Sequence, residues 1–268
     1  MIEEPRVHVQ TDRTALAATV AAAFVAKVTD LVAEFGEATI VLTGGTMGEA
    51  VLEAVRTAPG VARMPWDRIN VWWGDERWLP AGDAERNETL ARRALLDHVP
   101  VDPARIHPMP AADAGLDLDA AAAAYEAEIA AAAPSHLALP PFDILFLGVG
   151  PDGHVASLFP NASGIRERER LVIPVRNSPK PPAERLSLTL PVINSAVRAW
   201  MVLSGHDKAS PLGLALAGAS VDEVPVAGVR ARRTTIFWVD QDAAAEVPSS
   251  LIEPGEFWTA DDDQSDAS

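Results

Sequence analysis

The chain has 268 residues and no cysteine, which excludes a disulfide framework, a thiolate nucleophile and a cysteine-ligated zinc. Hydrophobic residues make up 48% of the sequence, enough to build a core and to exclude wholesale disorder. The formal net charge is −16, yet nine of the 38 acidic residues lie from Asp240 onward, where no Lys or Arg occurs. The acidity is therefore largely C-terminal, and residues 259–268 are expected to form a solvated, disordered tail.

The same composition limits the partners of the protein. No basic stripe suited to nucleic acid is evident, and no run reaches the roughly 18–20 apolar residues of a membrane span. The first residues lack the basic and apolar segments of a secretory signal. The sequence therefore predicts a cytoplasmic protein that binds neither nucleic acid nor membrane. Without repeats or a dividing linker, residues 1–258 are expected to form one domain.

Strand-like apolar runs alternate with segments of helical periodicity, the pattern of an α/β protein with a mostly parallel sheet covered on both faces. In the first half of the chain we expect a helix over 12–35 capped by Asp12, a buried strand over 38–42, a helix after 43–46, a strand over 68–73 and a helix from Asn87 through His98. A helix over 117–133 and a buried strand over 142–147 follow. The last part has strands near 171–175, 185–190 and 198–203, a helix between Asp207 and Ala217, and a strand over 234–239.

Ligands of open α/β sheets bind beyond the carboxyl ends of the strands, where three loops of this chain carry unusual residues. The first loop is Thr43-Gly44-Gly45-Thr46, between a strand and a helix. Its glycines let the backbone approach a ligand, and the N–H groups at the helix start favour an anion. A tight turn with Thr46 as the helix N-cap is the alternative interpretation.

The second loop, Gly74-Asp75-Glu76-Arg77, places two carboxylates and a guanidinium directly after a Val-Trp-Trp strand. The planar guanidinium of Arg77 is suited to polarising a carbonyl or clamping a phosphate. A solvated loop whose charges pair with one another is the alternative.

The third loop, 148–154, matches the G-x-G-x-x-G signature of dinucleotide-binding proteins and ends in His154. That signature requires a full helix from the third glycine, but Pro160 ends the segment within two turns. It also requires an acidic residue after the next strand, where this chain has Arg176. We therefore interpret this glycine loop as a rigid support for Asp152 and the proton-exchanging His154. A structural histidine with satisfied hydrogen bonds is the alternative.

Two further cations complete the candidate site. Lys208 follows the strand near 198–203 and lies near a helix N-terminus, where the helix dipole and the ammonium would act on one anion. Arg185 begins another strand after a proline-rich loop. An ordinary surface cation is the alternative for each residue, and for Arg185 the sequence favours neither interpretation.

Several catalytic motifs are missing from the sequence. It contains no G-x-S-x-G elbow, no H-E-x-x-H pair and no G-x-x-x-x-G-K-[ST] loop. A serine hydrolase, a metallohydrolase and ATP-driven phosphoryl transfer are thus disfavoured, and no metal or cofactor is expected. The remaining chemistry is proton transfer by His154 or a carboxylate on a small anionic substrate.

Five segments together resemble the 6-phosphogluconolactonase family, the soluble lactonases of the pentose phosphate pathway. They are Leu42-Thr43-Gly44-Gly45-Thr46, Trp73-Gly74-Asp75-Glu76-Arg77 with Asn87 downstream, the stretch Gly148 to Pro160, Arg185 to Pro191, and Gly205-His206-Asp207-Lys208-Ala209. They occur in family order over residues 42–209. The 13-residue stretch from Gly148 to Pro160 is highly specific, whereas the glycine pair at 44–45 is not. One departure is Glu85-Arg86 before Asn87, where the family often has serine.

The resemblance implies a three-layer α/β/α sandwich with a modified doubly wound sheet, related to glucosamine-6-phosphate deaminase. It also implies hydrolysis of a sugar-phosphate lactone. We expect the protein to act as a monomer. The catalytic residues implied are His154, Asp75, Arg77 and Asp152; the substrate-binding residues are Gly44, Gly45, Thr46, Asn87, Gly150, Arg185 and Lys208.

Two alternatives from other functional classes are retained. In the related deaminases the stretch after the histidine runs into Phe-Asn-Glu-Pro, and the glutamate belongs to a ring-opening proton relay. Here Phe159 replaces that carboxylate, which disfavours a deaminase or isomerase. A non-catalytic sugar-phosphate sensor of the same fold is the second alternative, but one domain filling the chain leaves no room for a DNA-binding module.

Overall fold

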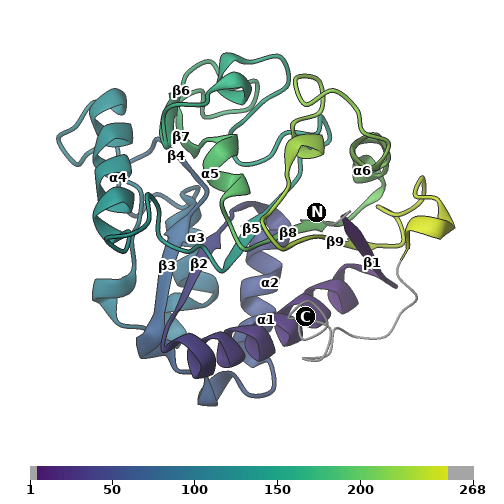
Figure 1. Ribbon diagram of the computed structural model, residues 1–268, viewed down its shortest axis with the longest axis horizontal. Helices are drawn as coiled ribbons and strands as arrows, with labels where there is room; N and C mark the ends of the chain where they lie inside the picture. Colours follow the sequence, from purple (N-terminus) through teal and green to yellow (C-terminus); the bar gives the residue numbers. More distant parts are fainter. Residues whose placement is uncertain (1–4, 253–268) are drawn as a thin grey trace.

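A computed structural model describes residues 5–252, so the expected acidic tail at 259–268 lies outside the described residues. At its centre is a sheet of six parallel strands (Figure 1). In spatial order the strands are β1 (Arg6–Gln10), β9 (Thr234–Asp240), β8 (Arg198–Leu203), β5 (Ile144–Leu147), β2 (Ala38–Leu42) and β3 (Ile69–Trp73). The expected α/β class and parallel sheet are confirmed.

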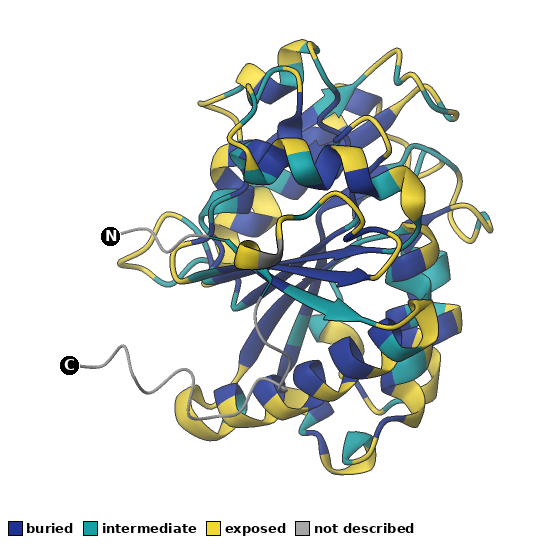
Figure 2. Ribbon diagram, turned by 90° about the vertical axis from the view of Figure 1, so that its right-hand side faces the viewer, coloured by how far each residue is buried: buried dark blue, intermediate teal, exposed yellow. Residues whose placement is uncertain are grey.

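Helices and a smaller sheet cover the two faces of the central sheet. One face packs against α1 (Arg13–Phe35), α2 (Gly45–Thr57) and α3 (Asn87–Ala94), and the other against α4 (Leu118–Ala132), α5 (Leu190–Asn194) and α6 (Ala209–Leu216). Because side chains alternate along a strand, Ile40 and Leu42 enter the first core while Val41 enters the second. Figure 2 shows the buried strands between these layers, as the expected three-layer sandwich requires.

A second sheet, absent from the sequence-based expectations, lies above one face of the first. Its three antiparallel strands are arranged in the order β4 (Asp75–Arg77), β7 (Arg185–Leu188) and β6 (Val172–Val175). Only Gly74 separates β3 from β4, so the chain passes from one sheet into the other within one residue. The expectation that 74–77 is a loop was wrong, because its backbone pairs with β7.

The helix boundaries follow the expected capping only in part. Asp12 caps α1, its carboxylate accepting hydrogen bonds from the N–H groups of Thr14 and Ala15 at 2.8 and 2.9 Å. The expected cap at Asn87 was wrong, since Arg86 occupies that position. The expected extension of this helix to His98 was also wrong, because Leu95, with φ −144° and ψ −55°, leaves the helical conformation and a separate 3₁₀ turn follows.

Among the described residues, α1 is the one helix long and apolar enough to cross a membrane by length and composition. Of its most apolar stretch, 56% is buried inside the protein. The helix packs against α2 and the sheet, so its apolar face belongs to the core.

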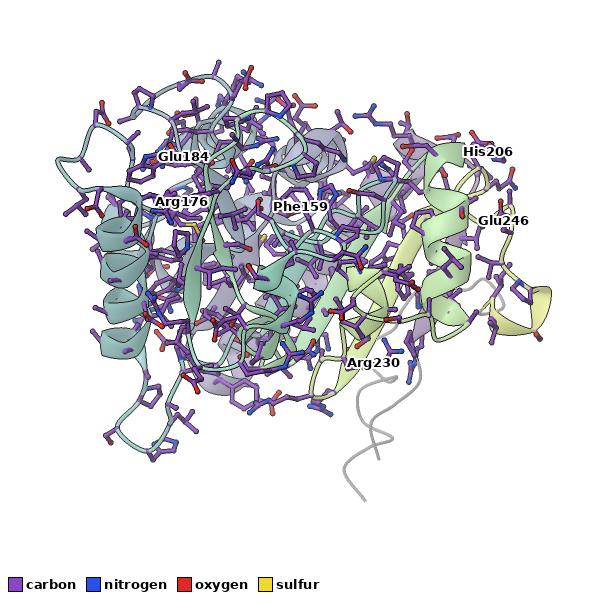
Figure 3. The ribbon with its side chains drawn as sticks, turned by 90° about the horizontal axis from the view of Figure 1, so that it is seen from above. Phe159, Arg176, Glu184, His206, Arg230 and Glu246 are labelled. Atoms are coloured by element: carbon purple, nitrogen blue, oxygen red, sulfur yellow. The ribbon has the colours of Figure 1, made fainter. Side chains whose placement is uncertain are left out.

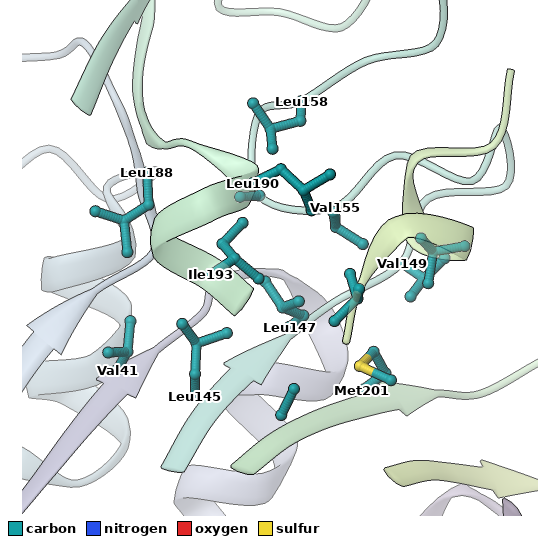
Figure 4. Packing of buried hydrophobic residues seen from close by; sticks show 14 of the residues in the cluster. Val41, Leu145, Leu147, Val149, Val155, Leu158, Leu188, Leu190, Ile193 and Met201 are labelled. Carbon is teal, nitrogen blue, oxygen red and sulfur yellow. The ribbon is translucent and has the colours of Figure 1, made fainter. Parts of the chain in front are cut away.

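An aliphatic cluster around α5 packs beside the loop 150–154, which carries Asp152 and His154 (Figure 4). Val149 and Val155 flank that loop, and their backbones form an antiparallel bridge. Leu147 at the end of β5 and Ile193 of α5 are fully buried beside them. The loop between the two valines is thus held at both ends by buried apolar side chains.

Candidate active site

A cleft of about 290 Å³ opens at the carboxyl ends of β2, β5 and β8. It is lined by ten of the eleven predicted site residues: Gly44, Gly45, Thr46, Asp75, Arg77, Asn87, Gly150, His154, Arg185 and Lys208. The eleventh, Asp152, contacts the cleft-lining His154 from behind. Residues from all five of the segments quoted above are therefore brought together, in the position expected for an α/β sheet.

The loop 148–154 holds an Asp–His pair. Asp152 Oδ1 lies 2.5 Å from His154 Nδ1, and the backbone N–H of Gly150 donates to the His154 carbonyl at 2.9 Å. No helix begins at Gly153, which agrees with the rejection of a dinucleotide-binding loop. Burial raises the pKa of Asp152, but the His154 hydrogen bond and the charges of His154 and Lys180 outweigh it and lower the pKa to about 2. Asp152 is thus an anion that accepts a hydrogen bond from His154 Nδ1. The other ring nitrogen of His154, Nε2, is left for proton transfer.

Phe159 fixes the other side of the imidazole. Its ring centroid lies 4.7 Å from that of His154, with the planes inclined by 39°. The Arg185 guanidinium carbon lies 5.8 Å from the Phe159 centroid. Figure 3 places Phe159 toward the middle of the molecule, and only 3% of its surface is exposed. The apolar ring therefore occupies space between the candidate base and a candidate phosphate-binding cation.

A hydrogen-bonded chain connects Asp75, Asn87 and Arg77. Arg77 Nη1 donates to Asn87 Oδ1 at 2.7 Å, and Asn87 Nδ2 donates to the Asp75 carbonyl at 2.8 Å. Asp75 Oδ2 accepts from Ser157 Oγ at 2.7 Å. Asn87 is the first residue of α3, and its side chain orients the guanidinium of Arg77 on β4. The sequence did not indicate this role.

Glu76 lies behind this chain and is 1% exposed. Its carboxylate accepts from the backbone N–H groups of Arg77, Asn87 and Glu88 at 2.7 to 2.9 Å. Burial raises the pKa of Glu76 to about 7, although the nearby Arg86 charge and these hydrogen bonds oppose the shift. The residue therefore ties β4 to the start of α3 and does not line the cleft.

Arg185 is 6% exposed and is held by the proline-rich loop that precedes it. Its guanidinium donates to the carbonyls of Lys180, Pro181 and Pro182 at 3.0 to 3.3 Å. Burial lowers its pKa, and the charge of Arg77 acts in the same direction. This cation is fixed in position rather than solvated, contrary to the surface alternative.

The start of α2 and Lys208 form the remaining walls of the cleft. Gly44 is the N-cap of α2, so the alternative in which Thr46 caps this helix was wrong. A Cβ on Gly44 would lie 1.8 Å from Asn87 Oδ1, which explains the requirement for glycine. Lys208 immediately precedes α6 and pairs with Asp207, Nζ to Oδ2, at 2.9 Å.

The cleft also contains a cation that the sequence analysis missed. Lys180 lines it from the proline-rich loop, and its Nζ lies 3.8 Å from Asp152 Oδ1. The run of prolines before Arg185 was the available signal, because it holds that loop against the site. Across the part of the chain that the structure describes, no group of three or more His, Asp or Glu residues is arranged to hold a metal ion.

Comparison with known proteins identifies the family of this chain. The family model described as glucosamine-6-phosphate isomerases/6-phosphogluconolactonase matches residues 11–238. The chain belongs to this family. A 6-phosphogluconolactonase of Streptomyces coelicolor is 48% identical over 258 residues, covering 95% of this chain and 99% of the relative.

Solved structures of the family share the fold. The 6-phosphogluconolactonase of Thermotoga maritima has a TM-score of 0.77 at 26% identity, covering 89% of this chain and all of that one. A monomeric glucosamine-6-phosphate deaminase has a TM-score of 0.75 at 20% identity, covering 90% of this chain and 99% of that one. The expected relation to both branches of the isomerase/lactonase family is confirmed at the level of the fold.

Proposed function

We propose that the protein hydrolyses 6-phospho-D-glucono-1,5-lactone to 6-phospho-D-gluconate, the second step of the oxidative pentose phosphate pathway, without a metal or cofactor. The observation that carries the proposal is the Asp152–His154 pair, joined at 2.5 Å in a cleft that also contains Arg77, Arg185 and Lys208. A proton-transfer group beside several cations suits an ester that carries a phosphate. The 48% identity to a lactonase supports the same substrate.

Hydrolysis begins with removal of a proton from water by His154 Nε2, since Nδ1 is held by Asp152. The water oxygen forms a bond to C1, and the carbonyl oxygen becomes an oxyanion. Arg77 and the N–H groups of Gly44 and Gly45 stabilise that charge. The bond between C1 and the ring oxygen then breaks, and His154 returns its proton to the ring oxygen.

The substrate phosphate is held by Arg185 and Lys208. Arg185 is fixed by three backbone carbonyls, and Lys208 precedes a helix whose N-terminus favours an anion. Asp75 and Asn87 position Arg77, and Thr46 lies beside the glycine turn. We propose that the protein acts as a monomer in the cytoplasm.

A deaminase is the second candidate because the family includes both activities. Phe159, which packs against the imidazole of His154, occupies the position where the sequence analysis places the glutamate of the related deaminases. A phenyl ring has no proton to give to or take from a sugar ring oxygen. This replacement favours the lactonase.

Lactone hydrolysis by the purified wild type and His154→Ala, measured side by side with spontaneous opening subtracted, tests the proposal. The variant is expected to lose about 10²–10⁴-fold in kcat, as the removal of a general base predicts. His136→Ala is the matched control, since His136 is exposed on a loop outside the cleft. A folded wild type that fails to accelerate lactone opening but releases ammonia from glucosamine 6-phosphate would reverse the choice between the two functions.

A further inference from the structure

The ammonium of Lys180 is placed against the catalytic pair. Its Nζ lies 3.8 Å from Asp152 Oδ1, the same oxygen that lies 2.5 Å from His154 Nδ1. The ammonium and the imidazole thus approach one carboxylate oxygen, and both side chains line the cleft.

The backbone of Lys180 is fixed while its side chain remains accessible. Its carbonyl accepts hydrogen bonds from Ser178 Oγ at 2.8 Å and Arg185 Nη2 at 3.1 Å, and its N–H donates to Ser178 Oγ at 3.2 Å. The side chain is nevertheless 42% exposed. The anchored loop therefore presents a solvated ammonium to the cleft.

The other cations of the cleft have close partners. Arg77 donates to the Glu85 carbonyl and to Asn87 at 2.8 and 2.7 Å, and Lys208 pairs with Asp207 at 2.9 Å. The distance of 3.8 Å between Lys180 and Asp152 exceeds hydrogen-bond length, and that oxygen is already occupied by His154. Lys180 consequently retains donors for a ligand anion.

The reaction creates such an anion at this position. The lactone carries charge only on its phosphate, whereas the hydroxy acid product carries a carboxylate at C1 as well. Because His154 delivers water to C1 from Nε2 while its Nδ1 contacts Asp152, the imidazole alone separates the new carboxylate from the ionised Asp152. Two carboxylates at close range repel each other unless a cation lies nearby.

We propose that Lys180 binds the C1 carboxylate of the product and offsets its repulsion by Asp152, a role that rests on the proposed lactonase function. Lys180 then acts as the open-chain acid forms, while Arg185 and Lys208 hold the phosphate. This division assigns the two anionic ends of the product to different cations. The affinity for the carboxylate end of the product, rather than for its phosphate, therefore depends on Lys180.

Calorimetric binding of two ligands to the full-length protein tests this assignment. One ligand is 6-phosphogluconate, and the other is glucitol 6-phosphate, in which a hydroxymethyl group replaces the carboxylate. Lys180→Gln is expected to weaken 6-phosphogluconate about 10-fold, as the loss of one charge-assisted hydrogen bond implies, with glucitol 6-phosphate nearly unaffected. Lys180→Arg should retain most of the affinity for 6-phosphogluconate.

The matched control is Arg176→Gln, which removes one positive charge from outside the cleft. Arg176 pairs with Asp119 of α4 and lies well away from Phe159 in Figure 3. Equal weakening of both ligands by Lys180→Gln would make Lys180 a phosphate ligand and overturn the proposal, as would no change for either ligand. A wild type that hydrolyses the lactone while Lys180→Gln binds 6-phosphogluconate normally would refute the role of Lys180 alone. Absence of lactone hydrolysis by the wild type would refute the underlying function.

Discussion

Arg77 and Arg185 are register partners across the antiparallel pair of β4 and β7. Directly opposite residues send their side chains to the same face of a sheet, and like charges in that relation destabilise it. The positive charge of Arg77 accordingly adds to burial in lowering the pKa of Arg185. Both guanidinium groups line the cleft, so an anion bound there relieves their repulsion.

Inorganic phosphate is therefore expected to stabilise the protein more than chloride at the same ionic strength. A ligand at 100 times its Kd adds about 2.7 kcal/mol, which corresponds to a rise in Tm of roughly 5–10 °C for a chain of this size. Arg185→Met should lower the Tm without ligand and abolish most of the rise caused by phosphate, whereas Arg176→Met should leave that rise unchanged. Equal rises in Tm in phosphate and in chloride, measured by thermal unfolding, would contradict the proposed anion site.

Gly150 is expected to be essential for the position of the catalytic pair. A Cβ at this residue would lie 2.0 Å from His154 Nδ1 and 2.4 Å from Asp152 Oδ1. Gly150→Ala must therefore displace the imidazole, and a shift of about 1 Å is expected to lower kcat about 10²-fold. At Gly74 an added Cβ would meet only ordinary contacts, 3.7 Å from the Leu42 carbonyl oxygen. Gly74→Ala should keep near-wild-type turnover; comparable losses in both variants would point to general destabilisation instead.

The sequence was sufficient to predict the segments whose signal is local. The five-residue strand β2 is buried throughout, and its continuous apolar run predicted a parallel strand. Asp12 likewise caps α1 through its own side chain. Strand β1 was missed because Arg6–Gln10 lies at the sheet edge with only Val7 fully buried, so no such run marks it.

Features created by distant pairing were not predictable in this way. Asp75–Arg77 reads as a charged loop because its strand character comes from pairing with residues more than 100 positions later. The contact of Lys180 with Asp152 also depends on how two loops meet, and nothing in the residue spacing indicates it. Candidate site residues in glycine-rich loops were identified, whereas their supporting partners required the structure.

The lowered pKa of Asp152 predicts the pH dependence of its contribution to stability. Because the folded-state pKa, about 2, lies below the ordinary value of 3.8, the contribution is present above pH 3.8 and is lost as the pH falls through about 2. Urea unfolding of wild type and Asp152→Asn should therefore give the largest difference in unfolding free energy between about pH 5 and 7, and a smaller one by about pH 3. A difference that is constant over this range would show that Asp152 stabilises the loop without its charge.

Among the charged residues outside the cleft, Arg86 is expected to be the one whose replacement lowers the free energy of unfolding most. It is fully buried, it donates to the carbonyls of Leu79 and Met109 at 3.2 and 2.8 Å, and its Nη2 lies 3.6 Å from Glu76 Oε2. Arg86→Met leaves the buried carboxylate of Glu76 without its cation, which typically costs about 3–5 kcal/mol. Urea unfolding measures this loss, and a cavity effect alone would give a loss independent of pH.

The pH dependence of that loss distinguishes the charge from the packing. Burial already raises the pKa of Glu76 to about 7, so its contribution to stability is present below pH 4.5 and is lost as the pH rises through 7. Removing Arg86 takes away a charge that opposes this shift, so the pKa rises further and the deficit of Arg86→Met should be larger at pH 8 than at pH 5. Adding Glu76→Gln should remove this pH dependence and recover part of the stability, because no buried carboxylate then remains to be ionised. If Arg86→Met lost the same free energy at both pH values, Glu76 would not be the partner whose charge Arg86 compensates.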